Sequence, residues 1–444
     1  MKKIFFYIAL VVFAHAQSGV TVFGLRVFGN NDEYNPPVIL TNQVITIEFD
    51  VATPLPPNLK IIFRHTSKDW VDDENLMVND PAKTESNYLA YTVAPNGVHS
   101  YTYRFRNSFP NDRNLVDFEY SGNYSFTVVD KDAGDAPLAH GKFIVAQNIV
   151  PATMTIKNVI LPSLSSPWNQ VNYIAVDVSA SDAYQANDPN SLIHSDITTV
   201  DIIQNWKIAQ PYRIDVNHRD PDTFVEHYYL PHKLFWIRDI PTGNEYRRLD
   251  LSDATAYPNY QLAVLRNGPD VSRFQWQGEP DANGASKLRP FIGANSEYLD
   301  VQLNLRLPTV PAKKVFAVGG FSDWEVRPAY EMHIDTVTGL FRVQFSVRRG
   351  VYDYQYVLSE MKGGQPENED WISLEGNDWR TINRYIALVY YRDERFGGFD
   401  RIVGIVHGRS PGGGLDKSVS FSKNGVMLVP VNDRGASIKS RSDQ

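Results

Sequence analysis

The stretch from Phe341 to Leu358, FRVQFSVRRGVYDYQYVL, contains two alternating runs joined by a short turn. Apolar residues occupy every second position from Phe341 to Val347, and again from Tyr352 to Leu358. A period of two residues is that of a β-strand, whose successive side chains point to opposite faces of a sheet. The stretch therefore predicts two strands separated by a turn at Arg349-Gly350. Each strand is expected to direct one row of side chains into a core and the other toward solvent.

The same period recurs along the chain, and turn-forming clusters separate the runs. Further alternating runs are Ile45–Val51, Tyr124–Val128 and Leu299–Leu307. Clusters of Pro, Asn and Gly, such as Pro95-Asn96-Gly97, supply the backbone angles that tight turns need. Aromatic residues, which favour strands, make up 12% of the 444 residues. Short strands with frequent turns predict an all-β protein of three consecutive immunoglobulin-like or fibronectin-like antiparallel β-sandwiches.

Breaks between the alternating series suggest the domain boundaries. One series ends at Phe143-Ile144-Val145, and a stretch rich in Pro, Asn and Gly precedes the run at Leu299. A glycine-rich sequence of linker composition follows His407. The expected segments are a signal peptide (1–16), an N-terminal sandwich (17–147), a middle sandwich (148–297), a C-terminal early-set immunoglobulin-like sandwich (298–408) and a flexible tail (409–444).

The N-terminus has the features of an export signal. Two lysines precede an apolar run, and Ala14-His15-Ala16 forms a small-x-small cleavage site, which predicts cleavage between Ala16 and Gln17. A membrane anchor is the alternative, but the apolar run is too short to cross a bilayer. Removal of Lys2 and Lys3 would change the net charge from −8 to −10. We expect an exported chain without membrane insertion of its own.

Composition excludes several classes of chemistry. The chain has no cysteine, so disulfides, thiolate metal sites, cysteine nucleophiles and a lipidated cysteine are excluded. Its formal charge of −8 disfavours a nucleic-acid-binding surface.

Motifs with catalytic or metal-binding associations have simpler interpretations here. Gly408–Gly412 matches G-x-S-x-G, but a proline and further glycines follow the serine where a nucleophile elbow needs a helix. Asp130–Asp135 lacks most ligands of a calcium loop, and a hairpin turn is favoured. His227 and His232 do not have zinc-binding spacing. We predict no catalytic, cofactor-binding or metal-binding residue, and no cofactor.

Trp324 is the one aromatic residue singled out as a contact candidate. It ends the segment Gly320-Phe-Ser-Asp-Trp324, in a pattern that resembles early-set immunoglobulin-like domains, including glycogen-binding modules. Trp324 is therefore either a platform for a glycan or partner, or a packing residue. An aromatic side chain in a sandwich is more often packing area, which favours the second interpretation.

The combined pattern resembles the plug-protein family of the Bacteroidetes type IX secretion system, formerly a domain of unknown function. The likeness covers roughly residues 20–408. The segments that carry it are Phe63-Arg64-His65, Asp69-Trp70, Tyr103–Phe109, Ser121–Tyr124, Val200–Trp206, Gly320–Trp324, Gly350–Val357, Gly376–Trp379, Tyr390–Arg392 and Phe399–Gly404. The family's Thr-Glu-Asn motif reads Thr381-Ile382-Asn383 here, and the extension from Ser410 has no recognised counterpart.

The resemblance implies a binding role and not an enzyme. Plug proteins of this kind sit on the periplasmic side of the large outer-membrane β-barrel translocon and close its opening when cargo is absent. The implied location is the periplasm, with attachment to the outer membrane through that protein partner. The alternative is a periplasmic or surface glycan-binding protein that uses the domain around Trp324. A third hypothesis is an accessory chain of a glycoside hydrolase.

Overall fold

The computed structural model describes residues 19–111, 113, 115–160, 170–179, 194–218, 220–229, 232–273, 281–288 and 293–410. The predicted signal peptide, its cleavage point at Ala16 and Gln17, and the tail from residue 411 onward lie outside the described residues. In the described part, short strands arranged in mostly antiparallel sheets make up nearly all of the regular structure. The all-β prediction is confirmed. The immunoglobulin-like assignment stays a prediction.

The first body comprises residues 19–147 and consists of two sheets packed face to face. Its core between the sheets is aromatic, and Phe63, Phe105 and Phe126 are each at most 2% exposed. The first sheet has the order β1 (Val22–Gly29), β3 (Ile45–Val51), β7 (Tyr103–Phe109), β6 (Tyr91–Val93). The second has the order β2 (Val38–Leu40), β9 (Ala136–Ala146), β8 (Gly122–Asp130), β4 (Leu59–Thr66), β5 (Glu85–Ser86). The short helices are α1 (Pro81–Thr84) and the 3-10 turn η1 (Lys131–Ala133).

The turn η1 lies within the segment Asp130–Asp135 that was considered as a calcium loop. It connects β8 to β9, which pair antiparallel. Asp130 accepts a hydrogen bond from the backbone N–H of Asp132, as the cap of this turn. The favoured interpretation, a hairpin turn, is confirmed.

The second body comprises residues 148–241 and 384–410, so it is built from two separate parts of the chain. Its first sheet has the order β10 (Ala152–Ile160), β11 (Gln170–Ser179), β15 (His232–Pro241), β14 (Thr223–Tyr229). Its second has the order β13 (Tyr212–Asp215), β12 (Ile197–Gln204), β26 (Arg384–Asp393), β27 (Phe399–Arg409). The 3-10 turns are η2 (His194–Asp196) and η5 (Arg395–Gly397). Buried residues of both parts share one apolar core, with Val176 and Phe235 packed together with Val389 and Val403.

The third body comprises residues 242–383 and contains one ten-stranded sheet that folds over its main core, with a smaller apolar cluster around Trp324. The main path is β16 (Arg247–Asp250), β24 (Val351–Lys362), β21 (Lys314–Gly319), β22 (Glu331–Asp335), β23 (Leu340–Arg348), β20 (Tyr298–Arg306), β17 (Ala263–Val264). Three strands lie off this path: β18 (Asp270–Val271), β19 (Ser286–Lys287) and β25 (Gln365–Asp370). The 3-10 turns are η3 (Gly293–Ser296) and η4 (Pro328–Tyr330).

The sheet pairing corrects the expected boundary between residues 297 and 298. β16 pairs with β24 and therefore belongs to the third body, although it lies in the segment expected to be the middle sandwich. β26 pairs with β12, which brings the end of the predicted C-terminal sandwich into the second body. The third body is thus inserted into the second. Alternation identifies a strand, but its partner is a long-range property that alternation does not encode.

The described chain also runs slightly further than the expected start of the tail at residue 409. Arg409 is the last residue of β27. Ser410 is buried; its hydroxyl donates a hydrogen bond to the carbonyl of Thr381 at 3.0 Å and accepts one from the N–H of Asn383 at 2.8 Å.

The turn at Arg349-Gly350 is present, but it does not close a hairpin. β23 pairs with β20 and β22, whereas β24 pairs with β21 on the other side of the fold. A side chain at Gly350 would come within 2.2 Å of Leu288, so the chain crosses here in close contact with its neighbour. Both faces of β24 are buried, because Asp353, Gln355 and Val357 are covered as well as the tyrosines. The prediction that one row of side chains on this strand faces solvent is therefore wrong.

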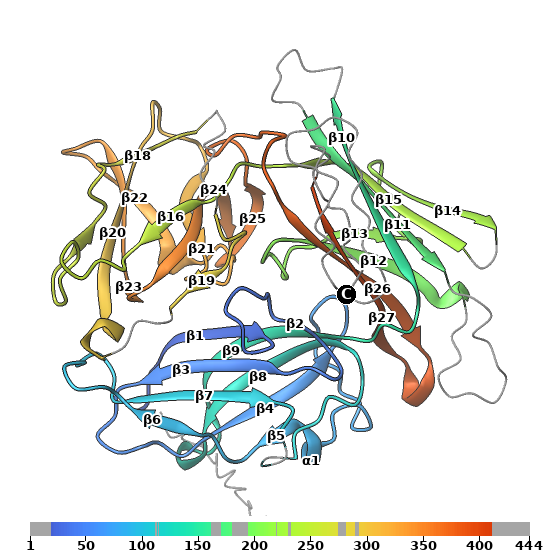
Figure 1. The fold of residues 1–444 in the computed structure, drawn as a ribbon, viewed down its shortest axis with the longest axis horizontal. Helices are drawn as coiled ribbons and strands as arrows, with labels where there is room; N and C mark the ends of the chain where they lie inside the picture. The colour runs from blue at the N-terminus through green and yellow to red at the C-terminus, as the bar shows by residue number, and fades with distance from the viewer. Residues whose placement is uncertain are drawn as a thin grey trace, which may run out of the picture.

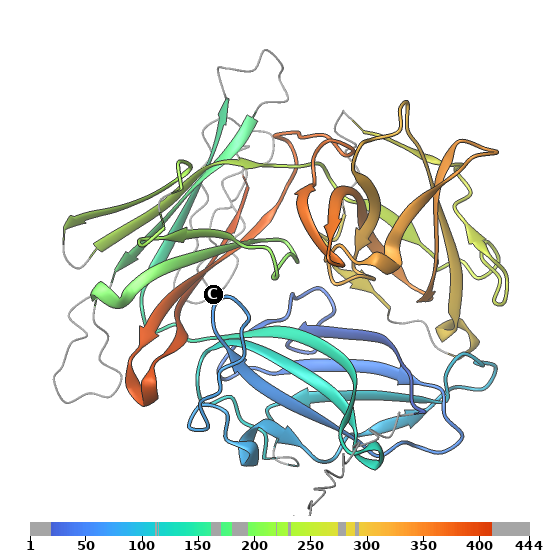
Figure 2. The same cartoon turned by 180° about the vertical axis from the view of Figure 1, so that it is seen from behind.

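The three bodies surround a common centre, and each one contacts the other two (Figure 1). The first body lies along the bottom of the view, with the second and third above it. The view from behind shows β26 and β27 running together along the second body (Figure 2).

Candidate functional site

Charged and polar side chains join the three bodies, and we treat these junctions as the candidate functional site. Loop Ser67–Val71, named here the Lys68 loop, extends from the end of β4 in the first body. The Ser67 N–H donates to the Val71 carbonyl at 2.8 Å, and Trp70 adopts a left-handed backbone angle of 62°. This tight turn presents Lys68 and Asp69 to the second body.

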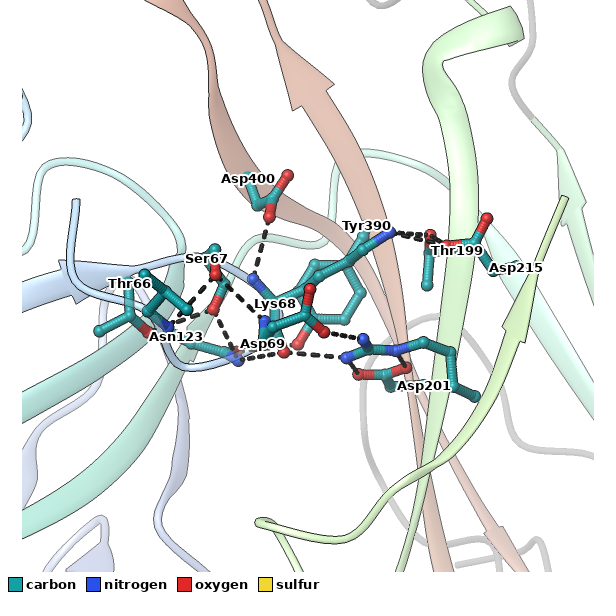
Figure 3. Close-up of polar contacts among 12 residues, drawn as sticks. Thr66, Ser67, Lys68, Asp69, Asn123, Thr199, Asp201, Asp215, Tyr390 and Asp400 are labelled. Carbon is teal, nitrogen blue, oxygen red and sulfur yellow. Dashed lines mark hydrogen bonds and ion pairs between the residues drawn. The ribbon is translucent and has the colours of Figure 1, made fainter. Parts of the chain in front are cut away.

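Lys68 is held by its backbone as well as by its side chain (Figure 3). Its N–H donates to a carboxylate oxygen of Asp400 on β27 at 2.9 Å. Its ammonium group donates to Asp215 at 2.7 Å and to the hydroxyl of Thr199 at 2.9 Å. Its carbonyl accepts a hydrogen bond from Arg213 at 2.8 Å. One residue therefore connects the first body to three strands of the second, β12, β13 and β27.

Arg213 completes this junction with a forked contact to Asp201. Its Nε and Nη2 donate to the two carboxylate oxygens of Asp201 at 2.7 and 2.8 Å, and its remaining nitrogen pairs with Asp69. Asp201 is 2% exposed. A bidentate pair of this kind fixes direction as well as distance.

An apolar cluster lies beside these polar contacts. Ile144 and Ala146 of β9 pack together with Ile386, Leu388 and Ile402 of the second body, and Trp70 covers the group. The hydroxyl of Tyr390, at the same place, donates to Asn123 at 2.8 Å. The junction thus combines a small apolar core with satisfied polar groups, as a permanent interface does.

A second junction joins the first body to the third through buried charges on β3. Cross-strand register places Glu48 opposite Arg26 and Arg106, and the Arg106 guanidinium donates to Glu48 at 2.7 Å. Arg348 of the third body donates to the other oxygen of Glu48 at 2.7 Å, and it also lies 3.5 Å from Asp50. We name these residues the Glu48 network.

The Glu48 network is almost closed to solvent, since Glu48, Asp50 and Arg348 are 2%, 0% and 5% exposed. Burial alone would raise the pKa of Glu48. The charges of Arg348 and Arg26 and the hydrogen bond from Arg106 outweigh burial and hold that pKa well below its usual range. Glu48 is therefore ionised and paired across the junction.

A third set of contacts centres on Glu297, which is fully buried. Its carboxylate accepts hydrogen bonds from the backbone N–H groups of His99 at 2.7 Å and Ser100 at 3.2 Å in the first body. It also accepts one from the hydroxyl of Tyr260 at 3.0 Å. These bonds fix the loop before β7 against the third body.

Trp324, the candidate contact residue, lies in a core and not on a surface. It is 2% exposed, its ring centre is 4.3 Å from that of Tyr246, and its indole N–H donates to the carbonyl of Gly284 at 2.8 Å. The glycan-platform interpretation is wrong for this residue, because neither face of the ring is open. The packing interpretation accounts for its position.

The other sequence candidates do not converge on a site. Within the described ranges, no group of three or more His, Asp or Glu side chains is placed to hold a metal ion. His232 lies 3.1 Å from Asp177, while the side chain of His227 lies outside the described residues. Of G-x-S-x-G, the described part ends at Ser410, which is buried. No helix in the described part is long and apolar enough to cross a membrane.

Lys207 lies in a cleft of about 480 Å³ between the second and third bodies, and its pKa is strongly lowered. Burial lowers its pKa to about 7, against the opposing charge of Glu369. Its amine lies 4.1 Å from the ring centre of Trp371. Glu369 already accepts hydrogen bonds from Trp371 and Gln210. Since structural clusters also perturb pKa values, this cleft alone assigns no reaction.

Sequence reasoning did not find the junction residues, although one signal was present. Glu48 and Asp50 alternate on one strand, and Arg104 and Arg106 alternate with the same spacing on another. Opposite charges at matched spacing predict cross-strand pairing. The Lys68 loop has no such charge pattern, because its partners lie more than a hundred residues away in the sequence; only the family resemblance, through Asp69-Trp70, points to it.

The contribution of the Lys68 side chain to stability can be tested by the substitution Lys68→Met. Loss of its bonds to Asp215 and Thr199 is expected to lower the free energy of unfolding by about 1–2 kcal/mol at pH 7. The pKa of Asp215 is lowered because hydrogen bonds from Lys68 and from the N–H of Asn217 outweigh burial. This stabilisation is therefore present above about pH 4 and decreases as the pH falls through the lowered pKa.

Urea unfolding of the full chain at several pH values measures this effect. Lys362→Met is the matched control, since Lys362 and its partner Glu367 are 80% and 45% exposed. The control is expected to change the free energy by less than about 0.5 kcal/mol. Equal losses in the two variants would contradict the assigned role of Lys68.

Comparisons with known proteins agree with this architecture. A crystal structure of a hypothetical protein from Parabacteroides merdae superposes with a TM-score of 0.69 at 19% sequence identity. The match covers 88% of this chain and 97% of the other, so the two proteins share a fold. No curated protein matches the chain.

Residues 22–147 match the family model described as the Type 9 secretion system plug protein 1st domain. These residues form nearly all of the first body, and they include the Lys68 loop and the β3 half of the Glu48 network. The match links the chain to type IX secretion. The resemblance to the type IX secretion plug family, inferred from the sequence, is therefore confirmed by the family match over residues 22–147.

Proposed function

We propose that this chain is a non-enzymatic periplasmic plug that binds and seals the outer-membrane translocon of the type IX secretion system. The observation that carries the proposal is the family match over the first body. The junctions support it, because they join that body to the other two through buried ion pairs, hydrogen bonds and an apolar cluster.

Rigidity is the physical property that connects this structure to sealing. A plug must present one preformed surface to the rim of a pore and must not yield to thermal motion of its parts. Domains joined by small polar interfaces usually move relative to one another. Here the Glu48 network and the Lys68 loop add ion pairs and hydrogen bonds between the bodies, and any separation of the bodies would have to break them together. The three bodies therefore act as one unit.

The partner in this proposal is a very large β-barrel of the outer membrane. The plug is held at that membrane by protein contact, in the periplasm, after cleavage of the predicted signal peptide. The chain binds no nucleic acid, in keeping with its net charge of −8.

Deletion of the gene tests the sealing function. Without the plug the translocon is expected to leak, and cells should become hypersensitive to antibiotics that are too large for ordinary porins. Complementation with the full chain is expected to restore resistance, whereas a chain that lacks residues 1–16 should not. Unchanged permeability after deletion would count against sealing.

Affinity purification from solubilised outer membranes tests the partner. The full chain, tagged and expressed at its natural level, is expected to retain a very large β-barrel that mass spectrometry identifies as the translocon. The purification should be carried out with secretion blocked and with secretion active, because a plug is expected to be bound mainly when cargo is absent. Absence of the barrel in both states, together with unchanged permeability, would overturn the proposal.

A further inference from the structure

One edge of the first body is open. Its first sheet has the order β1, β3, β7, β6, and β6 has no further strand on its outer side within the described chain. Figure 1 shows β6 at the end of this sheet that lies away from β1. An unpaired edge strand exposes a row of backbone donors and acceptors that a second strand can use.

The backbone groups that point outward on β6 can be identified from its register. Ala94 donates its N–H to the carbonyl of Thr102 at 2.8 Å, so Ala94 forms a hydrogen-bonded pair with β7. The side chain of Asn107 bonds both backbone groups of Ala90, at 2.7 and 3.1 Å. Because such pairs alternate in an antiparallel ladder, Tyr91 and Val93 direct their N–H and C=O groups outward. In the described part of the chain β6 pairs with β7 alone, so no strand faces these groups.

The side chains at this edge are apolar and accessible. Tyr91 and Val93 are 46% and 71% exposed, and neighbouring Tyr88 is 55% exposed. The Tyr91 ring lies 5.5 Å from that of Phe105, which belongs to the buried core. Tyr91 and Val93 therefore lie on the core face of the sheet, at a point where the opposite sheet does not cover them.

The chain around β6 carries no charge of its own, although the guanidinium of Arg113 lies 5.8 Å from the ring centre of Tyr88. No Asp, Glu, Lys or Arg occurs from Ser86 to Val98. Soluble proteins usually protect an exposed edge with lysine, proline or a bulge, because a bare edge attracts other strands. The protective devices present here are the three-residue length of β6 and Pro95, which follows it; no lysine occurs from Ser86 to Val98.

We propose that the outer edge of β6 is a docking site for an extended, uncharged segment of the translocon, which adds a strand to the first sheet. This inference rests on the proposed function. The incoming segment contributes backbone hydrogen bonds to Tyr91 and Val93 and places apolar side chains, at alternate positions, over the exposed core face. A charged segment is disfavoured, since its charges would be desolvated against this surface without partners.

A partner segment fits this edge better than a second copy of the chain. Strand β6 has only three residues, so two copies paired through it would bury little area and would form few hydrogen bonds. A longer strand from another protein can continue past β6 and cover Tyr88 as well. Self-association is accordingly one of the outcomes that the experiment separates.

Two substitutions at Val93 test the docking site in the full chain. Val93→Lys places a charge at the edge. Val93→Pro removes only the outward N–H, which has no internal partner, and proline is tolerated on edge strands. Val337→Lys is the matched control, because Val337 is 92% exposed in a turn of the third body. Circular dichroism melting should show that all four proteins fold equally well.

Retention of the mass-identified translocon from solubilised outer membranes is the first measurement. It is expected to fall at least tenfold for Val93→Lys and Val93→Pro and to stay unchanged for Val337→Lys. Hydrogen–deuterium exchange is the second measurement: the amides of Tyr91 and Val93 should exchange more slowly in the complex than in the isolated chain.

The possible failures are distinguishable. If all four proteins retain the translocon equally, or the two amides are not protected, the docking site is wrong and the proposed function stands. If the unmodified chain retains no translocon, the proposed function fails, and the docking proposal fails with it. If sedimentation shows that the isolated chain dimerises and that Val93→Lys abolishes the dimer, a second copy of the chain occupies the edge. The proposal that a translocon segment docks there is then overturned.

Discussion

Replacement of Arg348 by methionine is expected to lower the free energy of unfolding by about 3–5 kcal/mol at pH 7. Arg348 is 5% exposed and supplies the only charge from the third body that contacts Glu48 in the described structure. Without it, Glu48 loses a 2.7 Å bond and Asp50 loses a nearby cation, while both carboxylates stay buried. Removing one partner of a buried pair is costly because the remaining charge has no access to water.

The effect of this substitution is expected to depend on pH. Glu48 has a lowered pKa in the folded protein, so its stabilisation is complete above the unfolded value of about 4.3 and is lost as the pH falls further. The difference between the unmodified protein and the variant should therefore be largest near neutrality and should shrink below about pH 4. Urea unfolding of the full chain between pH 3 and 7 measures it.

Arg238→Met is the matched control for this prediction. Arg238 pairs with Asp222 at 3.2 Å, but the two side chains are 43% and 48% exposed. An exposed pair contributes at most about 1 kcal/mol. If both variants lose the same small amount, the Glu48 network does not hold the first and third bodies together.

The Glu48 network also shows what alternation can and cannot predict. The run Ile45–Val51 was correctly expected to be a strand, with Ile47 and Phe49 in the core. Its other row, Thr46, Glu48 and Asp50, was expected to face solvent, and this was wrong. A period of two residues separates two faces of a strand, but it does not reveal whether a second body covers the polar face. Only the cross-strand arginines signalled that these carboxylates have partners.

The sequence also did not predict which body the last two strands would join. The last alternating segments were expected to close the C-terminal sandwich, because neighbouring strands in sequence usually pair. Instead β26 and β27 return to the second body and pair with β12, about 180 residues earlier in the chain. Tyr385 and Val389 are as apolar as the strands around them, so composition did not distinguish the two bodies. Strand identity is local information, whereas strand partnership depends on the complete fold.

Trp324, the contact candidate from the sequence, could likewise not be placed by local pattern alone. Trp324 was considered both as a contact aromatic and as a packing residue, and its burial decides for packing. The residues that join the bodies are mostly charged and occur in loops or on polar rows, where sequence alone predicts a solvated surface. The family resemblance pointed to the Ser121–Tyr124 segment, and this segment does lie at a junction.

Gly122, in that segment, provides the second large expected effect. Its backbone angle φ is 154°, and a Cβ atom there would lie 2.1 Å from Nε2 of His65 and 3.0 Å from the carbonyl oxygen of Asp400 on β27. His65 cannot move aside easily, because it is fully buried and its two ring nitrogens lie 2.5 Å from Asp73 and 3.2 Å from the Ser121 carbonyl. Gly122 is thus a point of close approach between the first and second bodies.

Gly122→Ala is expected to lower the free energy of unfolding by about 3 kcal/mol or more, from overpacking and backbone strain together. Gly134→Ala is the matched control, since Gly134 also has a positive φ, 68°, but has no atom within 4 Å of its Cβ position. The control is expected to show only the left-handed strain of about 1–2 kcal/mol. Urea unfolding compares the two, and hydrogen–deuterium exchange should show faster exchange near Asp400 in Gly122→Ala alone. If the variants behave alike, the close approach at Gly122 does not limit how the two bodies pack.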